Sequence, residues 1–182
     1  MNSLKCAATV AAMLVGNVWA TNADAMTYAK ISVGQSGAEI EGINLTDGDA
    51  YGAALGANLG PVRVEVGVDR LAGALNAFGP SIEANALDYH ATAYLDLPVG
   101  DNAKAFAGVG LDYIDGQAGF FGTDIDASGD GWHWAAGASY RLSESITAEA
   151  QFRQVSASLD ADFLGDVDLD ASEVTLGLRF AL

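Results

Sequence analysis

The segment from Glu173 to Leu182 alternates between apolar and polar side chains. Five apolar side chains fall on one side of an extended chain: Val174, Leu176, Leu178, Phe180 and Leu182. Because side chains alternate across a strand, the segment predicts a ribbon with one apolar face and one polar face. About ten residues is also the length that a tilted strand needs to cross a bilayer. We therefore interpret this segment as the closing strand of a transmembrane barrel.

Seven earlier segments show the same period of two. They are Met26–Gln35, Ala50–Leu59, Val62–Asp69, Leu87–Leu97, Ala105–Tyr113, Trp132–Leu142 and Ile146–Val155. Connections of a few residues alternate along the chain with connections of roughly a dozen residues or more, which is long for hairpins. Outer-membrane barrels with an even strand number have short periplasmic turns and long extracellular loops in this order. The chain is therefore predicted to be all-β, an eight-stranded antiparallel up-and-down transmembrane β-barrel with four long extracellular loops.

Length and charge narrow the function classes. The chain has 182 residues, which favours a single domain. Its formal net charge is −16, with only eight Lys and Arg residues, whereas a nucleic-acid backbone requires many cations. We therefore expect no nucleic-acid partner.

The first 25 residues are predicted to be a cleaved signal peptide. Lys5 provides a short positive region, and the apolar run Cys6–Val15 is too short to span a membrane as a helix. Small residues allow cleavage after Ala20 or after Ala25. The barrel is then expected to comprise residues 26–182. Cys6 is the only cysteine and would leave with the signal peptide, so no disulfide is expected.

Aromatic side chains gather at the ends of the predicted strands. Tyr51, Tyr89, Tyr113 and Trp132 lie beside the long connections, whereas Tyr28, Tyr140 and Phe180 lie near the short turns. Aromatic belts at both membrane interfaces are typical of transmembrane barrels. We expect an aromatic girdle formed by Tyr51, Tyr89, Tyr113, Trp132, Tyr140 and Phe180.

A soluble β-sandwich or a lipocalin-like barrel would also alternate. The glycines on the polar face favour the membrane barrel, because an eight-stranded lumen is narrow and must be filled compactly. These glycines are Gly67, Gly108, Gly110, Gly137 and Gly177.

The layout resembles the small eight-stranded outer-membrane barrels of Gram-negative bacteria, namely the opacity-protein-like surface antigens and the transmembrane domain of OmpA. The resemblance lies in Ala107–Tyr113, Ala138–Leu142 with Ile146–Arg153, and Val174–Phe180. It implies an outer-membrane monomer that contacts lipid and lipopolysaccharide, is inserted by the outer-membrane assembly machinery and needs no cofactor. Such barrels usually end in an aromatic residue, whereas here the last residue is Leu182 and the aromatic residue is Phe180.

Charged residues on the polar face predict an ion-pair network in the lumen. An unpaired charge is costly in a low-dielectric interior, so these side chains should pair with one another. The expected members are Arg63, Glu65, Arg141, Glu149 and Arg179. The network would act either as a structural plug or, as the resemblance to OmpA suggests, as a small ion gate.

The long connections are acidic. Asp124, Asp126 and Asp130 resemble the first half of a calcium loop, but the expected bidentate Glu falls on Ala135, so we predict no metal site. Asp160, Asp162, Asp166, Asp168 and Asp170 lie in the last connection. A solvated acidic rim is one interpretation. A second is that divalent ions bridge these carboxylates to anionic lipid headgroups.

Catalysis would require a nucleophile, a base and an orienting group. The only histidines are His90 and His133, and both are predicted to face the lumen without a His-x-Ser arrangement on the lipid face. We therefore expect no catalytic residue, and a non-enzymatic role in envelope integrity or in surface interaction as an adhesin or antigen. A narrow ion or small-solute channel and a lipid A-modifying enzyme are the alternatives.

Overall fold

The computed structural model describes residues 26–40, 43–44, 48–75, 82–120, 123–161 and 165–182. The predicted signal peptide lies outside these residues. Strands account for most of the described chain: β1 (Met26–Ile40), β2 (Ile43–Asn44), β3 (Gly48–Leu59), β4 (Val62–Leu75), β5 (Ile82–Pro98), β6 (Ala103–Phe120), β7 (Thr123–Arg141), β8 (Ile146–Ala161) and β9 (Gly165–Ala181). Within the same residues, no helix is long and apolar enough to cross a membrane.

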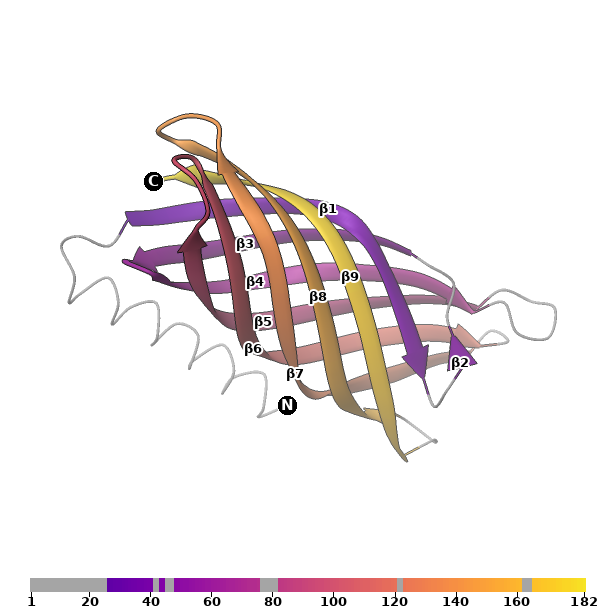
Figure 1. The fold of residues 1–182 in the computed structure, drawn as a ribbon. Helices are drawn as coiled ribbons and strands as arrows, with labels where there is room; N and C mark the ends of the chain where they lie inside the picture. Colours follow the sequence, from indigo (N-terminus) through magenta and orange to yellow (C-terminus); the bar gives the residue numbers. More distant parts are fainter. Residues whose placement is uncertain (1–25, 41–42, 45–47, 76–81, 121–122, 162–164) are drawn as a thin grey trace.

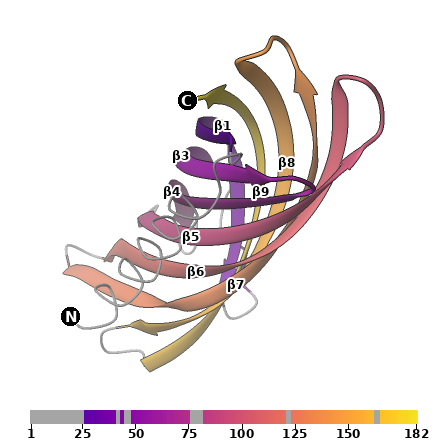
Figure 2. The same cartoon turned by 90° about the vertical axis from the view of Figure 1, so that its left-hand side faces the viewer.

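The strands form one closed antiparallel sheet. Each long strand pairs with the next one along the chain, and β1 pairs with β9 from Tyr28 opposite Ala181 to Ile40 opposite Leu169. The two-residue β2 pairs only with the end of β1 and takes no part in closure. The predicted eight-stranded barrel is therefore confirmed. Figures 1 and 2 show its tilted strands, with the C-terminus at the end that carries the short turns.

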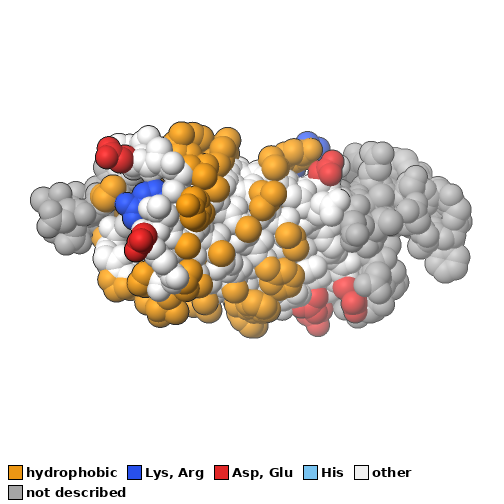
Figure 3. Space-filling view, turned by 45° about the horizontal axis from the view of Figure 1, so that its top comes forward, with side chains coloured by type: hydrophobic (Ala, Val, Ile, Leu, Met, Phe, Trp, Pro, Cys, Tyr) orange, Lys and Arg blue, Asp and Glu red, His pale blue; other side chains and the backbone are white. Residues whose placement is uncertain are grey.

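Alternation places the apolar side chains on the outside of the barrel wall. Leu111 is 71% exposed and Leu176 is 65% exposed. Many other large apolar side chains of the wall are also exposed. Figure 3 shows these side chains as a band across the middle of the molecule, with acidic groups towards both ends. Such a surface is stable in lipid rather than in water.

The strands extend beyond the predicted segments. β8 continues past Val155 to Ala161, and β9 begins at Gly165 rather than at Glu173. In β6 and β7, pairing continues to Phe120 opposite Thr123. Much of what was predicted as long loops is therefore strand, and the prediction of loop length was wrong in these places.

The predicted segments of β8 and β9 are too short because the apolar side chains change from the outward face to the inward face along these strands. From Ile146 to Phe152 the outward side chains of β8 are apolar. Nearer the C-terminal end of the strand they are Ser156, Ser158 and Asp160. The inward side chains become apolar over the same stretch. Together with neighbours from β6 and β9 they form a buried apolar cluster of Ile114, Val155, Ala157, Leu159, Leu169 and Ala171. A strand with this pattern has left the hydrocarbon and has water outside it.

Candidate functional site in the barrel lumen

Polar side chains of the strands project into the lumen and form two clusters at different heights. We call the first, near the short turns, the inner cluster: Tyr28, Lys30, Arg63, Glu65, Asp96, Glu149 and Arg179. We call the second, nearer the opposite end, the outer cluster: Asp69, Asp88, His90, Thr92, Asp112, His133, Arg153 and Glu173. Every one of these residues is at least about nine-tenths buried.

Two carboxylates organise the inner cluster. Glu65 lies 2.7 Å from Arg63 Nη1 and 3.1 Å from Lys30 Nζ. Glu149 lies 2.9 Å from Lys30 Nζ, 3.3 Å from Arg179 Nε and 3.5 Å from Arg63 Nη2. Each buried charge thus has a partner of opposite sign, as a low-dielectric interior requires.

Arg63 fills the centre of the inner cluster. Its Nε lies 3.3 Å from Asp96, and its guanidinium carbon lies 3.9 Å from the centroid of the Tyr94 ring and 4.9 Å from that of Phe106. These cation–π contacts add to the ion pairs. Buried side chains therefore fill the lumen at this height.

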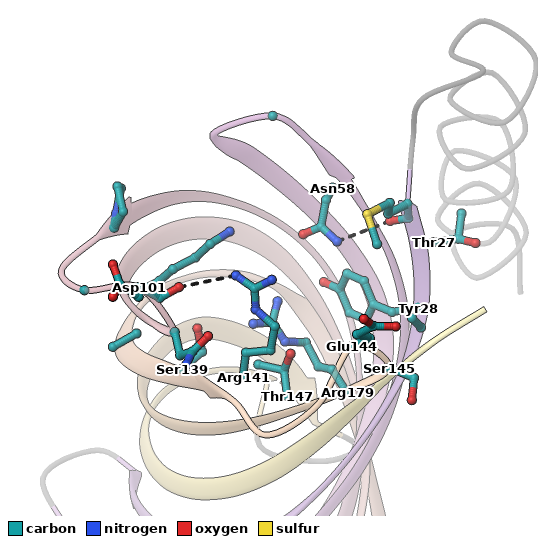
Figure 4. A pocket seen from close by; sticks show the side chains of 18 residues that line it. Thr27, Tyr28, Asn58, Asp101, Ser139, Arg141, Glu144, Ser145, Thr147 and Arg179 are labelled. Carbon is teal, nitrogen blue, oxygen red and sulfur yellow. Dashed lines mark hydrogen bonds between the residues drawn. The ribbon is translucent and has the colours of Figure 1, made fainter.

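Four of the five residues predicted for a lumen network lie together in the inner cluster: Arg63, Glu65, Glu149 and Arg179. Arg141 differs from the prediction. It is the last residue of β7, its side chain is exposed, and its Nη2 donates a hydrogen bond of 3.4 Å to the carbonyl of Asp101. Its position at the strand end lets the guanidinium reach the turn and water instead of the network (Figure 4).

Tyr28 also differs from its expected place near the aromatic belt. Its ring points into the lumen, and its hydroxyl donates a hydrogen bond of 2.9 Å to Glu65. The cause is register: Ile31 and Val33 face outward, so the even-numbered residues of this strand face inward. The six predicted girdle residues lie on the outer surface, half-buried or exposed: Tyr51, Tyr89, Tyr113, Trp132, Tyr140 and Phe180.

A cavity of about 510 Å³ opens at the short-turn end and leads towards the inner cluster. Its lining includes Arg141, Glu144 and Thr147 near the rim and Arg179 at the inner cluster (Figure 4). It forms a vestibule with charged residues both at its rim and at its inner end.

The outer cluster was not predicted, and Arg153 is its centre. Arg153 Nη2 lies 2.7 Å from Glu173, 2.8 Å from Asp69 and 2.8 Å from Asp88. Asp112 is 3.9 Å from Nη1. Four carboxylates therefore surround a single guanidinium. Among the described residues no group of three or more His, Cys, Asp or Glu side chains is arranged to hold a metal ion.

The two histidines of the outer cluster are joined through Thr92. Thr92 Oγ1 lies 3.0 Å from His133 Nε2 and 3.3 Å from His90 Nδ1. On the far sides, His133 Nδ1 lies 2.8 Å from Asp112 and His90 Nε2 lies 3.2 Å from Asp69. A continuous chain of hydrogen bonds thus connects β4, β5, β6 and β7.

Glycine makes room for these imidazoles. Gly67 pairs with His90 and Gly110 pairs with His133 on the neighbouring strands, and a Cβ at either glycine would collide with the ring. Gly56, Gly108 and Gly137 accommodate Tyr28, Tyr94 and Phe106 in the same way. Four of the five glycines predicted on the polar face, all except Gly177, therefore make room for rings in a narrow lumen.

A signal for the outer cluster existed in the sequence. Asp88, His90, His133 and Arg153 all lie on the predicted polar faces of their strands. Their meeting depends on the stagger between strands around the barrel, which no single strand encodes.

Comparisons with known proteins agree with this architecture. A family model described as "Outer membrane protein beta-barrel domain" matches residues 6–180. The structure is similar to that of Neisserial surface protein A, with a TM-score of 0.73 and 17% identity over 86% of this chain and 97% of that one. It is also similar to Ail, the attachment invasion locus protein of Yersinia pestis, with a TM-score of 0.57 and 14% identity over 86% and 99% of the two chains. None of the curated proteins matches the chain.

Proposed function

The chain belongs to the outer membrane protein beta-barrel domain family, and on this premise we propose that it is a non-enzymatic barrel for surface interaction, comparable to an adhesin or antigen. Its location is the outer membrane of a Gram-negative bacterium. The finer role is inferred from the parts of the barrel that differ from a simple lipid-facing wall.

The observation that carries the proposal is the inversion of polarity along β8 and β9. A hairpin that is apolar inside and polar outside is a folded, water-facing β-surface continuous with the membrane barrel. Rigid strands hold side chains in fixed positions, and fixed positions reduce the entropy lost on binding a partner. The outward residues of this surface are Ser156, Ser158, Asp160, Asp166, Asp168 and Asp170.

The charge of this surface favours a basic partner. Asp160 is paired with Asp166 in the register of β8 and β9, so two carboxylates lie directly opposite each other. Repulsion between like charges on neighbouring strands is relieved by a cation or a basic group. The solved structure of Ail contains a heparin analogue, sucrose octasulfate. A polyanion of that kind is disfavoured here by the sign of the charge.

Adherence measurements test the proposal. Cells that express the protein should bind histone-coated beads more than empty-vector cells do and should not gain binding to heparin-coated beads. Asp160→Asn with Asp166→Asn should lower the binding towards the empty-vector level. Asp101→Asn with Glu144→Gln removes the same number of carboxylates at the exposed short turns and should leave binding unchanged. Equal binding by expressing and empty-vector cells would contradict the proposal, and increased detergent sensitivity of a deletion strain would then favour envelope integrity.

A narrow ion channel is the second candidate, and the vestibule lined by Arg141 and Arg179 is the observation that favours it. We favour a closed lumen because ion pairs cross it at two heights and the apolar cluster lies beyond them. Conductance in a planar lipid bilayer separates the two candidates. Steady single-channel steps that disappear in Glu149→Gln would support the channel, and a silent bilayer would support the closed barrel.

A lipid A-modifying enzyme is the third possibility. Thr92, His133 and Asp112 have the order of a nucleophile, a base and an orienting acid. All three are buried, however, and Thr92 also bonds to His90, so a substrate carbonyl has no approach to the hydroxyl. Identical mass spectra of lipid A from cells with and without the protein would agree with a non-enzymatic role.

A further inference from the structure

The chain of hydrogen bonds through Thr92 has a fixed requirement for protons. A neutral imidazole carries one N–H and one bare nitrogen, and a hydroxyl carries a single hydrogen. His133 donates its Nδ1–H to Asp112, with 2.8 Å between the heavy atoms, so its Nε2 is bare when the ring is neutral. His90 donates its Nε2–H to Asp69 across 3.2 Å, so its Nδ1 is bare as well.

Two bare nitrogens would then face one hydroxyl. Thr92 can donate to His90 or to His133, but not to both, and the remaining pair would be lone pair against lone pair at 3.0–3.3 Å. One added proton removes the conflict, because a cationic ring donates to Thr92 while Thr92 donates to the other ring.

Arg153 gives independent support for a bound proton. Its Nη2 carries two hydrogens but has carboxylate oxygens of Asp69, Asp88 and Glu173 within 2.8 Å. Asp88 is fully buried, and neither of its oxygens accepts a hydrogen bond from the described residues. The cluster thus holds more negative charge than Arg153 balances, and an added proton lowers that excess.

We propose that the outer cluster is a proton-binding site that holds one exchangeable proton shared between His90 and His133 through Thr92. The proton completes hydrogen bonds that tie β4, β5, β6 and β7 together. Its loss would break one bond of the chain. The charged and titratable groups that face the site are Asp69 from β4, Asp88 from β5, Asp112 from β6, Arg153 from β8 and Glu173 from β9, with Lys30 of β1 below it.

The two rings are suited to share one proton because they are equivalent in surroundings. Each lies against a glycine of the adjacent strand, each has a carboxylate on its far side, and their centroids are 5.9 Å apart at an angle of 83°. Moving the proton between them requires two coupled transfers, in which the cationic ring gives its proton to Thr92 Oγ1 while the hydroxyl gives its own hydrogen to the other ring, and no movement of the backbone. The site therefore acts as a short relay across the lumen.

Nitrogen-15 NMR of histidine-labelled full-length mature protein in lipid nanodiscs tests the proposal. At neutral pH the wild type should show one imidazolium for its two histidines, either as one cationic and one neutral ring or as two averaged signals. Raising the pH should remove a single proton for the pair. Two neutral rings at neutral pH would overturn the proposal.

Substitutions of Thr92 sharpen this test. Thr92→Val keeps the shape and removes the hydroxyl, so the imidazolium signal should be lost at the same pH, whereas Thr92→Ser should retain it. Thr175→Val alters another buried, inward-facing threonine and should leave the signal unchanged. A Thr92→Val protein with the wild-type spectrum would contradict the shared proton. If Thr92→Val fails to fold, the wild type and Thr92→Ser still decide the proton count.

Discussion

Arg63 on β4 and Glu149 on β8 meet across the full width of the barrel, with 3.5 Å between Nη2 and Oε2. These strands are four places apart in the closed order of eight, so they stand on opposite walls. The same two strands are joined a second time, by Asp69 and Arg153 at 2.8 Å, with the charges exchanged. Two cross-lumen ion pairs of reversed polarity therefore brace the barrel at separate heights.

Loss of the charge on Glu149 should destabilise the barrel. Glu149→Gln keeps the shape but leaves Lys30, Arg63 and Arg179 with less negative charge nearby. Breaking a buried ion pair by removing one partner costs about 3–5 kcal/mol. We expect a lower urea midpoint for unfolding in lipid bilayers and a lower temperature for the shift of the heat-modifiable band on a gel.

A matched control separates this effect from a general loss of acidity. Glu144→Gln lies in an exposed turn and should behave like the wild type. Adding Lys30→Met to Glu149→Gln removes one of the uncompensated cations and should recover part of the loss. If both Glu149→Gln and Glu144→Gln unfold at the wild-type midpoint, the ion pairs of Glu149 do not contribute to stability.

Arg141 should be dispensable for stability, although its sequence pattern places it with the network. Its side chain is exposed and, among the described residues, donates a hydrogen bond only to the carbonyl of Asp101. Surface substitutions of this kind usually change stability by less than about 0.5 kcal/mol. Arg141→Gln should therefore unfold at the same urea concentration as the wild type, and a loss as large as that of Glu149→Gln would place Arg141 inside the network after all.

Period-two alternation was sufficient to predict the barrel and the inward direction of Arg63, Glu65, Glu149 and Arg179. It could not show that Lys30 and Asp96 complete the inner cluster, because their distance from Glu65 and Arg63 depends on strand stagger. Arg141 lies on the inward face of β7, as predicted, but at the end of the strand, which is too near the turn for its side chain to reach the inner cluster. Face is a local property of one strand, whereas height in the lumen is set by the whole barrel.

The extension of β8 and β9 beyond the predicted segments is visible in the sequence, but only if the apolar face is allowed to change sides along a strand. Val155, Ala157 and Leu159 alternate with Ser156 and Ser158 as regularly as any membrane segment. Only the direction of the apolar face is reversed. If only apolar residues on the outward face are taken to indicate a strand, the strand is predicted to end where this face becomes polar. The remaining paired residues of β8 and β9 are then assigned to a loop.

The inversion predicts opposite tolerance of charge at two outward positions on neighbouring strands. Leu176 on β9 is 65% exposed to lipid, and Leu176→Arg should cost about 2–4 kcal/mol if it lies near the midplane of the bilayer. Ser158 on β8 also faces outward, but beyond the point of inversion, so Ser158→Arg should be neutral. Urea unfolding in bilayers gives both values. Similar losses in the two variants would mean that Ser158 also lies in lipid.

Close packing of rings on glycine predicts a sharp difference between two glycines of β6. A Cβ at Gly110 would meet the His133 ring and lie 2.5 Å from the Ala91 carbonyl oxygen, whereas at Gly116 its nearest neighbour would be the Ala86 Cβ at 3.4 Å. Overpacking of a filled interior costs about 1–3 kcal/mol. Gly110→Ala should therefore lower the unfolding midpoint and displace His133 from Asp112, seen as a changed nitrogen-15 signal of that ring. Gly116→Ala adds the same methyl group on the same strand and should leave both readouts close to the wild type, so equal effects of the two substitutions would show that the imidazole does not rest on Gly110.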